Sequence, residues 1–453
     1  MTQSAVDVNF FDKDVNECPY HAYEQLREEA PVWKDPRTGM YVVTRYEDIR
    51  SILLDTTRFS NGVGNGANNT GKAIRPDDPE EAKRQAEIAR QAAAVTKLYE
   101  EKGWVPAPSL DARDDPNHIE MRRLFDYAFR PSAIRELDPF VEDLAYRLVE
   151  DFLPAGECEW VAQLAIPLPL YVIGHQVGVP DEDLPMIKTW TDAWIKRMGL
   201  MQTEEEMRWS VEMEIEGQHY FQKLFEQLRE EPNDTLLSVL VNREIPEWGR
   251  PLNDNELHAE MFADLFVGGS ETTTNALAEG VVILCQRPDI FEKVKSDPER
   301  YVERFSEEVL RLESPVQGLL RETVVDVEMH GVTIPAGSVV NLRYAAGNRD
   351  RRAFDRAEDF DLDRDKPRRH LAFGVGAHHC LGAPLARREL YYGFKALVDL
   401  VDEVWLAQDP STLEHHQNFF LRALKEVRIG FKPAAERRRS AARRSDDEWV
   451  DPE

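Results

Sequence analysis

Apolar residues recur at spacings of three and four along most of the chain, which is the pattern of amphipathic helices. Clear examples are residues 133–153 (AIRELDPFVEDLAYRLVEDFL) and residues 389–404 (ELYYGFKALVDLVDEV). A longer and more apolar helical pattern covers residues 259–289, where two adjacent glycines, Gly268 and Gly269, interrupt it. These patterns predict a protein that is mainly helical.

Strand-like alternation is scarce and confined to three short stretches. Residues 40–45 (MYVVTR) follow an Arg-Thr-Gly turn, residues 324–344 contain two or three short runs joined by Gly and Pro, and residues 418–431 alternate like a final hairpin. The sequence has no internal repeat and no Ser/Gly-rich linker that would divide it. We therefore expect a single domain over residues 1–433 that is mainly α with a small β-rich region.

Two further stretches differ from the rest in composition. Residues 61–77 (NGVGNGANNTGKAIRPD) are rich in Gly and Asn and predict a loop, and a charged, Ala-rich helical stretch follows over about 79–102. Residues 434–453 hold a basic cluster and an acidic end with few side chains to bury, which predicts a disordered tail.

The composition excludes several classes of protein. The 453 residues include 56 Lys and Arg against 84 Asp and Glu, and the net charge of −28 argues against partners such as nucleic acid or an anionic membrane surface. No stretch approaches the ~20 consecutive apolar residues of a membrane span, and the first residues resemble no signal peptide. The four cysteines are widely separated, which suits a reducing compartment. We therefore expect a cytoplasmic protein without a membrane anchor.

The most informative stretch is FGVGAHHCLG, residues 373–382, which a helix-like run follows. Gly374 and Gly376 permit positive φ angles and let the backbone approach a bulky flat group. Cys380 would then lie at the start of a helix, where amide N–H groups and the helix dipole stabilise a thiolate. Haem iron accepts such a soft ligand. For an isolated cysteine, the alternative is a buried side chain in a glycine-rich turn.

This string matches the Phe-Gly-x-Gly-x-His-x-Cys-x-Gly signature of the cytochrome P450 superfamily, and residues 385–387 (LAR) continue its bacterial form. The chain therefore resembles a soluble bacterial cytochrome P450. The resemblance implies the mainly α haem-thiolate fold of that family. It also implies heme b ligated by Cys380, with Phe373 and Gly374 among the cofactor-binding residues. Residues 61–115 fall where the family builds its variable cap over the substrate.

The resemblance also gives the interrupted helix a role. Two adjacent glycines inside a helix cost about 1 kcal/mol each relative to alanine, and in the family Gly268 and Gly269 would open a groove for dioxygen beside the haem. Thr272 and Glu271 align with the alcohol and the acid that deliver protons to the bound oxygen. For this stretch alone, the alternative is a Thr-rich helix that happens to bend.

Charged residues complete the resemblance. Glu308 and Arg311 lie one helical turn apart and match the family's Glu-x-x-Arg pair, whose third, structural member corresponds to Arg364. Taken alone, the pair would be an exposed salt bridge. Four cations match the family's partners of the two haem propionates: His118, Arg122, Arg321 and His378.

The implied function is a haem-dependent monooxygenase that uses O2 and an apolar small molecule, either a terpenoid, a steroid, a fatty acyl compound or an aromatic. Electrons would come from NAD(P)H through a ferredoxin reductase and a ferredoxin. By family position, the substrate pocket would draw on Phe262, Leu265, Phe266, Val316, Leu319, Leu320, Phe419 and Phe420. The alternatives are a peroxygenase that uses hydrogen peroxide, which the intact Glu271-Thr272 pair disfavours, and a non-catalytic haem-binding sensor.

Arginines gather around the cysteine loop despite the negative net charge. They are Arg349, Arg351, Arg352, Arg368, Arg369, Arg387 and Arg388. If several of them face the cysteine side of the molecule, they would steer an acidic ferredoxin. The alternative is that nearby acids simply neutralise them, namely Asp350, Asp355, Asp363 and Asp365.

Overall fold

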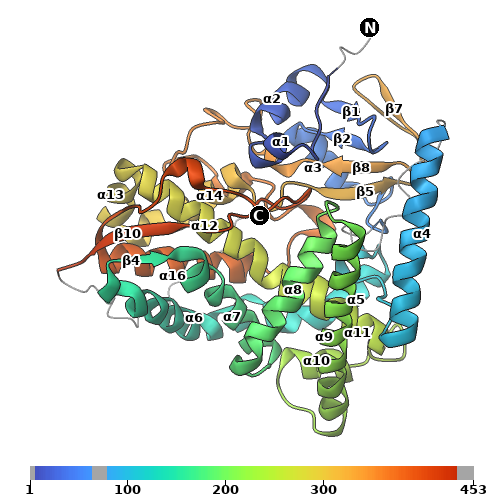
Figure 1. Cartoon of the computed structure of the whole chain (residues 1–453), viewed down its shortest axis with the longest axis horizontal. Coiled ribbons are helices and arrows are strands. Elements are labelled where there is room, and N and C mark those ends of the chain that lie inside the picture. The colour runs from blue at the N-terminus through green and yellow to red at the C-terminus, as the bar shows by residue number, and fades with distance from the viewer. Residues whose placement is uncertain (1–5, 64–78, 436–453) are drawn as a thin grey trace.

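The computed structural model describes residues 6–63 and 79–435, and most of this part of the chain is helical (Figure 1). The α-helices are α1 (Lys13–Glu17), α2 (Tyr20–Glu29), α3 (Tyr46–Leu54), α4 (Pro79–Lys102), α5 (Asn117–Phe129), α6 (Pro131–Phe152), α7 (Pro167–Val177), α8 (Leu184–Met198), α9 (Glu204–Glu230), α10 (Leu236–Asn242), α11 (Asp254–Glu260), α12 (Thr272–Gln286), α13 (Pro288–Ser296), α14 (Pro298–Glu313), α15 (Tyr344–Gly347) and α16 (Ala383–Leu400). Short 3₁₀ and π-helical segments are η1 (Leu110–Ala112), η2 (Leu153–Ala155), η3 (Val161–Ala165), η4 (Asp181–Asp183), η5 (Met261–Glu271), η6 (Pro367–Arg369), η7 (Gly376–His378) and η8 (Pro410–Thr412). This confirms the mainly α prediction.

The strands form small sheets at two ends of the molecule (Figure 1). They are β1 (Val32–Lys34), β2 (Tyr41–Val43), β3 (Phe59–Ser60), β4 (Glu157–Glu159), β5 (Leu319–Thr323), β6 (Val327–Met329), β7 (Val332–Ile334), β8 (Val339–Leu342), β9 (Val401–Leu406) and β10 (Arg428–Pro433). The largest sheet has the order β1-β2-β8-β5-β3 and lies beside α1 to α3. Its strands include those predicted over residues 40–45 and 324–344. The β4-β10-β9 sheet lies at the opposite end, and β6 pairs with β7.

Two local predictions near the C-terminal end were wrong. The predicted helix over residues 389–404 ends at Leu400, and residues Val401–Leu406 form β9, which pairs with β10. Residues 418–431 do not form a hairpin, since β10 pairs with β9 and β4 instead. The Asn418 side chain accepts hydrogen bonds from the backbone N–H groups of Phe420 (2.9 Å) and Leu421 (3.0 Å), which turns the chain out of a strand.

A continuous helical run of α11, η5 and α12 crosses the middle of the molecule (Figure 1). Its central part, around Gly268 and Gly269, is π-helical, at the place where the sequence predicts an interruption. The α12 part of this run packs against α14 and α16. A Cβ atom at Gly280 of α12 would lie only 2.3 Å from the Phe394 ring of α16, so glycine is what allows these helices to approach so closely. The C-terminal part of the central helix is therefore closely packed in the core.

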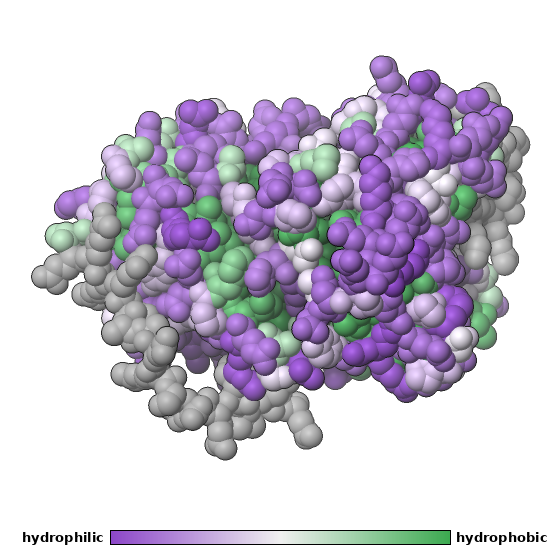
Figure 2. All heavy atoms as spheres, turned by 90° about the horizontal axis from the view of Figure 1, so that it is seen from below, coloured by the Kyte–Doolittle hydropathy of each residue, from purple (hydrophilic) through white to green (hydrophobic). Residues whose placement is uncertain are grey.

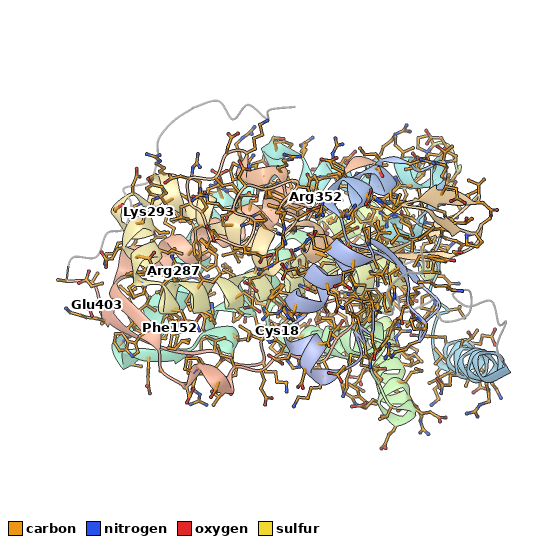
Figure 3. The ribbon with its side chains drawn as sticks, turned by 90° about the horizontal axis from the view of Figure 1, so that it is seen from above. Cys18, Phe152, Arg287, Lys293, Arg352 and Glu403 are labelled. Atoms are coloured by element: carbon orange, nitrogen blue, oxygen red, sulfur yellow. The ribbon has the colours of Figure 1, made fainter. Side chains whose placement is uncertain are left out.

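The described part of the segment predicted as a cap includes a long helix at one side of the molecule. Helix α4, which corresponds to the helical stretch predicted over 79–102, lies at the margin of the molecule (Figures 1 and 3). Near its C-terminal end, Tyr99 is buried against Val211 and Ile215 of α9. Residues 64–78, with most of the predicted loop, and residues 436–453, with most of the predicted tail, lie outside the described residues.

The face of the molecule seen in Figure 2 is predominantly hydrophilic, with apolar areas between the polar side chains. Within the described ranges, none of the helices has the length and apolar character required to cross a membrane.

Candidate active site

A cavity of about 300 Å³ lies between the central helix and the cysteine loop. Its wall comes from α5, η5, the start of α12, β5, the loop before α16 and the segment around η1. The residues of its wall that the sequence predicts for the site are His118, Arg122, Leu265, Gly268, Gly269, Glu271, Thr272, Val316, Leu319, Arg321, Phe373, Gly374, His378 and Cys380. The structure therefore brings residues from widely separated parts of the chain to one cavity.

The cysteine loop is a tight turn in front of α16. The N–H of Cys380 donates to the carbonyl of Phe373 at 2.9 Å, and Gly374 and Gly376 adopt φ angles of +65° and +80°. A Cβ atom at Gly376 would lie 3.0 Å from the carbonyl oxygen of Leu53, so this position requires glycine for two reasons. Outside the loop, the Arg387 guanidinium lies 4.6 Å from the centre of the Phe373 ring.

The environment of Cys380 opposes an isolated thiolate. Its side chain is exposed toward the cavity, yet the surrounding protein desolvates it and raises the pKa of the thiol above its ordinary value. Backbone amides of Gly382 and Ala383, with the charges of Arg122 and Arg387, partly offset this increase. A metal ion that takes the sulfur as a ligand displaces its proton, so the loop favours a thiolate that is bound to a metal.

Two arginines and two histidines line the same cavity. Neither Arg122 nor Arg321 forms an ion pair within the part of the chain whose side chains are described; Arg122 donates to the carbonyl of His379 at 2.9 Å, and Arg321 to that of Leu320 at 2.7 Å. The rings of His118 and His378 lie 3.9 Å apart, and Nε2 of His118 is buried without a hydrogen-bond partner. Burial, reinforced by His118, Arg321 and Arg122, lowers the pKa of His378 to about 3.

This arrangement fits a haem. A flat dianionic cofactor would supply the carboxylates that Arg122 and Arg321 lack among the residues with described side chains, and a partner for the buried Nε2 of His118. The glycines of η5 and of the cysteine loop leave room on both sides of a planar group. The donor set, a cysteine with cations around it, suits thiolate-ligated haem iron.

The Glu271-Thr272 pair lies at the junction of η5 and α12. The Thr272 hydroxyl donates to the carbonyl of Gly268 at 3.3 Å. Glu271 is buried, and its carboxylate lies 3.0 Å from Nζ of Lys188, which reaches it from α8. Burial raises the pKa of Glu271, while Lys188 acts in the opposite direction. A buried acid with one cationic partner is a candidate group for holding and releasing a proton.

Glu308, Arg311 and Arg364 form a buried cluster away from the cavity. Arg311 binds both carboxylate oxygens of Glu308 at 2.8 and 2.9 Å, and Nε of Arg364 donates to Oε1 of Glu308 at 2.8 Å. The two arginines also donate to backbone carbonyls of the segment that leads toward the cysteine loop, including that of Asp359. The cluster therefore fixes this irregular segment to α14.

The apolar wall of the cavity differs from the predicted pocket. Leu265, Val316 and Leu319 belong to it, whereas five predicted residues are buried elsewhere: Phe262, Leu320, Phe266, Phe419 and Phe420. The rings of Phe262 and Phe266 pack on Phe221 of α9, because they lie on the side of η5 that faces away from the cavity. The wall instead includes Phe125, Phe129, Ile173, Trp194, Met198 and Leu421.

Four charged residues of the site were missed by sequence reasoning: Lys188, Asp111, Asp264 and Glu389. Glu389 lies in α16, is buried with Oε1 unpartnered, and has its pKa raised by burial to about 8. Asp264 and Glu389 could have been noticed as single acids in helical stretches that are otherwise apolar or basic. Lys188 and Asp111 give no such signal, since each lies in ordinary polar sequence.

The seven arginines near the cysteine loop all form ion pairs. Carboxylates of Glu358, Glu24, Glu28, Glu303, Glu47, Glu307 and Asp138 accept from them. Arg352, labelled beside the N-terminal helices in Figure 3, binds Glu28 of α2 at 2.7 Å and Asp350 at 3.2 Å. This favours neutralisation over a net positive docking surface, although most of the partners are glutamates rather than the aspartates expected from the sequence.

Comparisons with known proteins identify the family of this chain. The cytochrome P450 family model matches residues 188–400. A putative cytochrome P450 123 of Mycobacterium tuberculosis is 32% identical over 90% of this chain and 93% of that protein. A steroid C26-monooxygenase of the same species is 29% identical over 91% of this chain and 94% of the relative. The solved structure of CYP109E1 from Bacillus megaterium in complex with corticosterone superposes with a TM-score of 0.73, at 30% identity, over 91% of this chain and 98% of that one.

Proposed function

The chain belongs to the cytochrome P450 family of haem-thiolate monooxygenases, and on that premise we propose that it inserts one oxygen atom of O2 into a C–H bond of an apolar small molecule. The observation that carries the proposal is the placement of two sets of residues on one cavity. Cys380 faces it from the start of α16, and Glu271 and Thr272 face it from the central helix.

The cavity wall supports an apolar substrate. Phe125, Phe129, Ile173, Trp194 and Met198 all contribute to it. Burial of such surface yields about 25 cal/mol for each Å² of apolar area removed from water, which is sufficient to hold a small hydrophobic molecule. Two of the similar proteins carry steroids in their names or complexes, and a terpenoid, steroid, fatty acyl or aromatic molecule is the class that we assign to this chain.

The residues around the cofactor each have a defined task in this proposal. When bound, haem supplies the activation of dioxygen and the oxidation of the substrate. Cys380 provides the thiolate ligand, and Gly382 and Ala383 stabilise that thiolate through their amides. Arg122 and Arg321, with His118 and His378, bind the two propionates and thereby fix the orientation of the cofactor.

Protons come from the central helix. The carboxyl of Glu271 exchanges a proton with solvent through the group of polar side chains on α8 that includes Lys188. The Thr272 hydroxyl, which donates to the Gly268 carbonyl, would hold the proton at the groove beside Gly268, where haem would supply the activation of dioxygen.

We assign the electron supply to NAD(P)H, a ferredoxin reductase and a ferredoxin. Cytochrome P450 monooxygenases require electrons from partners, and the chain offers exposed arginines such as Arg351, whose side chain is 63% exposed, beside the cysteine loop. Since glutamates pair with these arginines, the partner would dock on a surface of mixed charge rather than a basic one.

The test compares two sources of oxidising equivalents on the haem-loaded protein. Candidate substrates are first screened by the spectral shift that displacement of water from the iron produces. Hits are then incubated with NAD(P)H, ferredoxin reductase and ferredoxin, or with hydrogen peroxide alone. We expect hydroxylated product with the protein partners. Equal or faster turnover with peroxide alone would instead indicate a peroxygenase, and the lack of any spectral shift across the library would favour a sensor.

A further inference from the structure

We propose that a small second cavity beside Arg343 binds a single monatomic anion, chloride, which supplies the negative charge that this buried arginine lacks. The cavity has a volume of about 10 Å³ and lies between the N-terminal helices α1 and α2 and the segment around Phe419. The inference does not depend on the proposed function, because it concerns a different cavity.

Arg343 follows β8 and is enclosed by the protein, with only 1% of its surface exposed. Its guanidinium carbon lies 4.2 Å from the centres of the Phe10 and Phe419 rings, which both contribute to the cavity wall. Nη1 of Arg343 donates to the carbonyl of Phe419 at 2.9 Å, whereas Nε and Nη2 are buried without a hydrogen-bond partner. Buried donors that stay unpaired cost free energy, so a ligand that accepts from them would be bound.

The two unpaired groups form the edge of a guanidinium that other arginines of this chain use to bind a carboxylate. Arg311 binds Glu308 through Nε at 2.8 Å and through Nη2 at 2.9 Å. Arg388 binds Asp138 in the same way, at 2.6 and 2.9 Å. Among the residues with described side chains, no carboxylate lies within ion-pair distance of Arg343. Its Nε–Nη2 edge therefore has the geometry of an anion receptor, and the protein supplies no anion to it.

The groups nearest to Arg343 do not neutralise it. The Tyr23 hydroxyl donates to Oε1 of Gln317 at 2.9 Å, and burial raises the pKa of Tyr23, so this hydroxyl is not a phenolate. Asp35 acts on Arg343 from beyond ion-pair distance, and its carboxylate already accepts from the Thr38 hydroxyl at 2.8 Å. Burial lowers the pKa of Arg343, but an arginine stays charged in proteins.

A second arginine of the cavity wall has a free donor as well. Arg422 pairs with Glu279 and Glu313, so its charge is compensated. Its Nε is nevertheless buried without a hydrogen-bond partner. The cavity therefore has unpaired N–H groups from two arginines and an uncompensated charge from one of them, which suits one monovalent anion.

The size of the cavity selects the kind of anion. One water molecule requires about 10–15 Å³, so phosphate, sulfate and carboxylate groups are too large. A water molecule could accept from the free edge of Arg343, but it would leave the buried charge uncompensated, which is costly. A chloride ion accepts from several N–H groups at once and also carries the missing charge.

An anion at this place would join segments that are far apart in the sequence. Phe10 precedes α1, Arg343 follows β8, and Phe419 lies before β10. Leu421 contributes to this cavity and also to the larger one, and the backbone N–H of Phe419 donates to the carbonyl of Gly199 at the end of α8 at 3.1 Å. Chloride should therefore stabilise one wall of the larger cavity together with the N-terminal segment.

The first experiment locates the ion in crystals of the haem-loaded protein. Bromide replaces chloride in these crystals, because it has the same charge and its anomalous X-ray scattering distinguishes it from water. We expect an anomalous peak at the Nε–Nη2 edge of Arg343 in the unmodified protein. The peak should be absent in Arg343→Met, whose side chain is apolar.

The second experiment measures the site in solution by the thermal unfolding midpoint of the haem-loaded protein. Sodium chloride replaces sodium gluconate at constant ionic strength, and gluconate is too large for the cavity. A ligand that binds only the folded state raises the midpoint, and we expect a saturable increase of about 2 °C at ~200 mM chloride. Arg343→Met should lose this increase. The matched control is Arg388→Met, which should retain it, because Asp138 already occupies the same edge of Arg388.

A cavity without an anomalous peak in crystals that contain bromide would overturn the proposal, since its occupant would then be water. An equal effect of chloride on the unmodified protein and on Arg343→Met would also overturn it. A bromide peak without any effect of chloride in solution would indicate an adventitious ion only, and it would count against the proposal in the same way. The first and third of these outcomes need the unmodified protein alone, so they remain decisive if Arg343→Met folds poorly.

Discussion

At the level of single residues, the cavity carries opposite charges on different walls. Arg122 of α5 and Arg321 of β5 contribute positive charge to the cavity wall, whereas Glu271 and Asp264 lie on the central helix. The two arginines can hold an anionic cofactor, while Glu271 can hold a proton. The raised pKa of buried Glu271 and the lowered pKa of His378 both follow from desolvation, which acts against the charged form of each group.

Thr272 provides the most specific test at this scale. In Thr272→Ala the cavity loses the hydroxyl that passes protons to oxygen, so we expect haem binding and oxygen consumption to continue while most electrons appear as hydrogen peroxide. The measurement is the ratio of hydroxylated product to oxygen consumed. Thr274→Ala is the matched control, since that hydroxyl donates to the Ala165 carbonyl at 2.9 Å and not toward the cavity. Full coupling in Thr272→Ala would remove Thr272 from the mechanism.

At the level of elements, the site depends on a turn and a helix that are both fixed by buried polar contacts. The cysteine loop has Gly376 against the backbone of α3, and α14 holds the preceding segment through Glu308 and its two arginines. On the opposite side of the cavity, η5 departs from α-helical geometry where its glycines face the cavity. These elements place the ligand and the oxygen groove across from each other.

The structure predicts different effects for an alanine substitution at Gly376 and at Gly249, another glycine with a positive φ angle. Gly376→Ala combines a positive φ with a Cβ atom 3.0 Å from the Leu53 carbonyl, whereas Gly249→Ala has a φ of +60° and nothing within 4 Å. We expect Gly249→Ala to lose about 1–2 kcal/mol of unfolding free energy. Gly376→Ala should lose more and retain less haem after gel filtration. If both variants lose the same amount and retain the same haem, the close approach to α3 is unimportant.

The buried charge cluster makes a prediction about stability. In Glu308→Gln, Arg311 and Arg364 lose their carboxylate partner inside the protein, which should cost about 3–5 kcal/mol in the free energy of unfolding. Glu303→Gln on the same helix removes a half-exposed partner of Arg368 and should cost within about 1 kcal/mol. Urea unfolding of both variants measures the difference. Similar values for the two would show that the cluster does not hold this segment.

Across the whole molecule, the sequence predicts contacts that are local and misses those that depend on tertiary packing. The cysteine loop is contiguous, and Glu308 and Arg311 lie on one helical turn, so spacing alone brings them to notice. The orientation of Phe419 and Phe420 depends on the turn set by Asn418, and that of Phe262 on the packing of α9 against η5. Lys188 and Asp111 reach the site from distant elements, which no short pattern encodes.

The charge of the surface near the cysteine loop also depends on tertiary packing. The basic cluster around the cysteine loop is evident from the sequence, but its neutralisation depends on glutamates from α2, α3 and α14, such as Glu28, Glu47 and Glu303. Pairing across elements therefore decides the electrostatic character of that surface.

The most direct test of the central claim is the absorbance difference spectrum of the reduced protein with and without carbon monoxide. Cys380 as a thiolate ligand predicts a strongly red-shifted Soret band, and Cys380→Ser should abolish that band. A band typical of histidine-ligated or thiol-ligated haem in the unmodified protein would contradict the account, because the thiolate on which the proposed oxygen chemistry depends would then be missing.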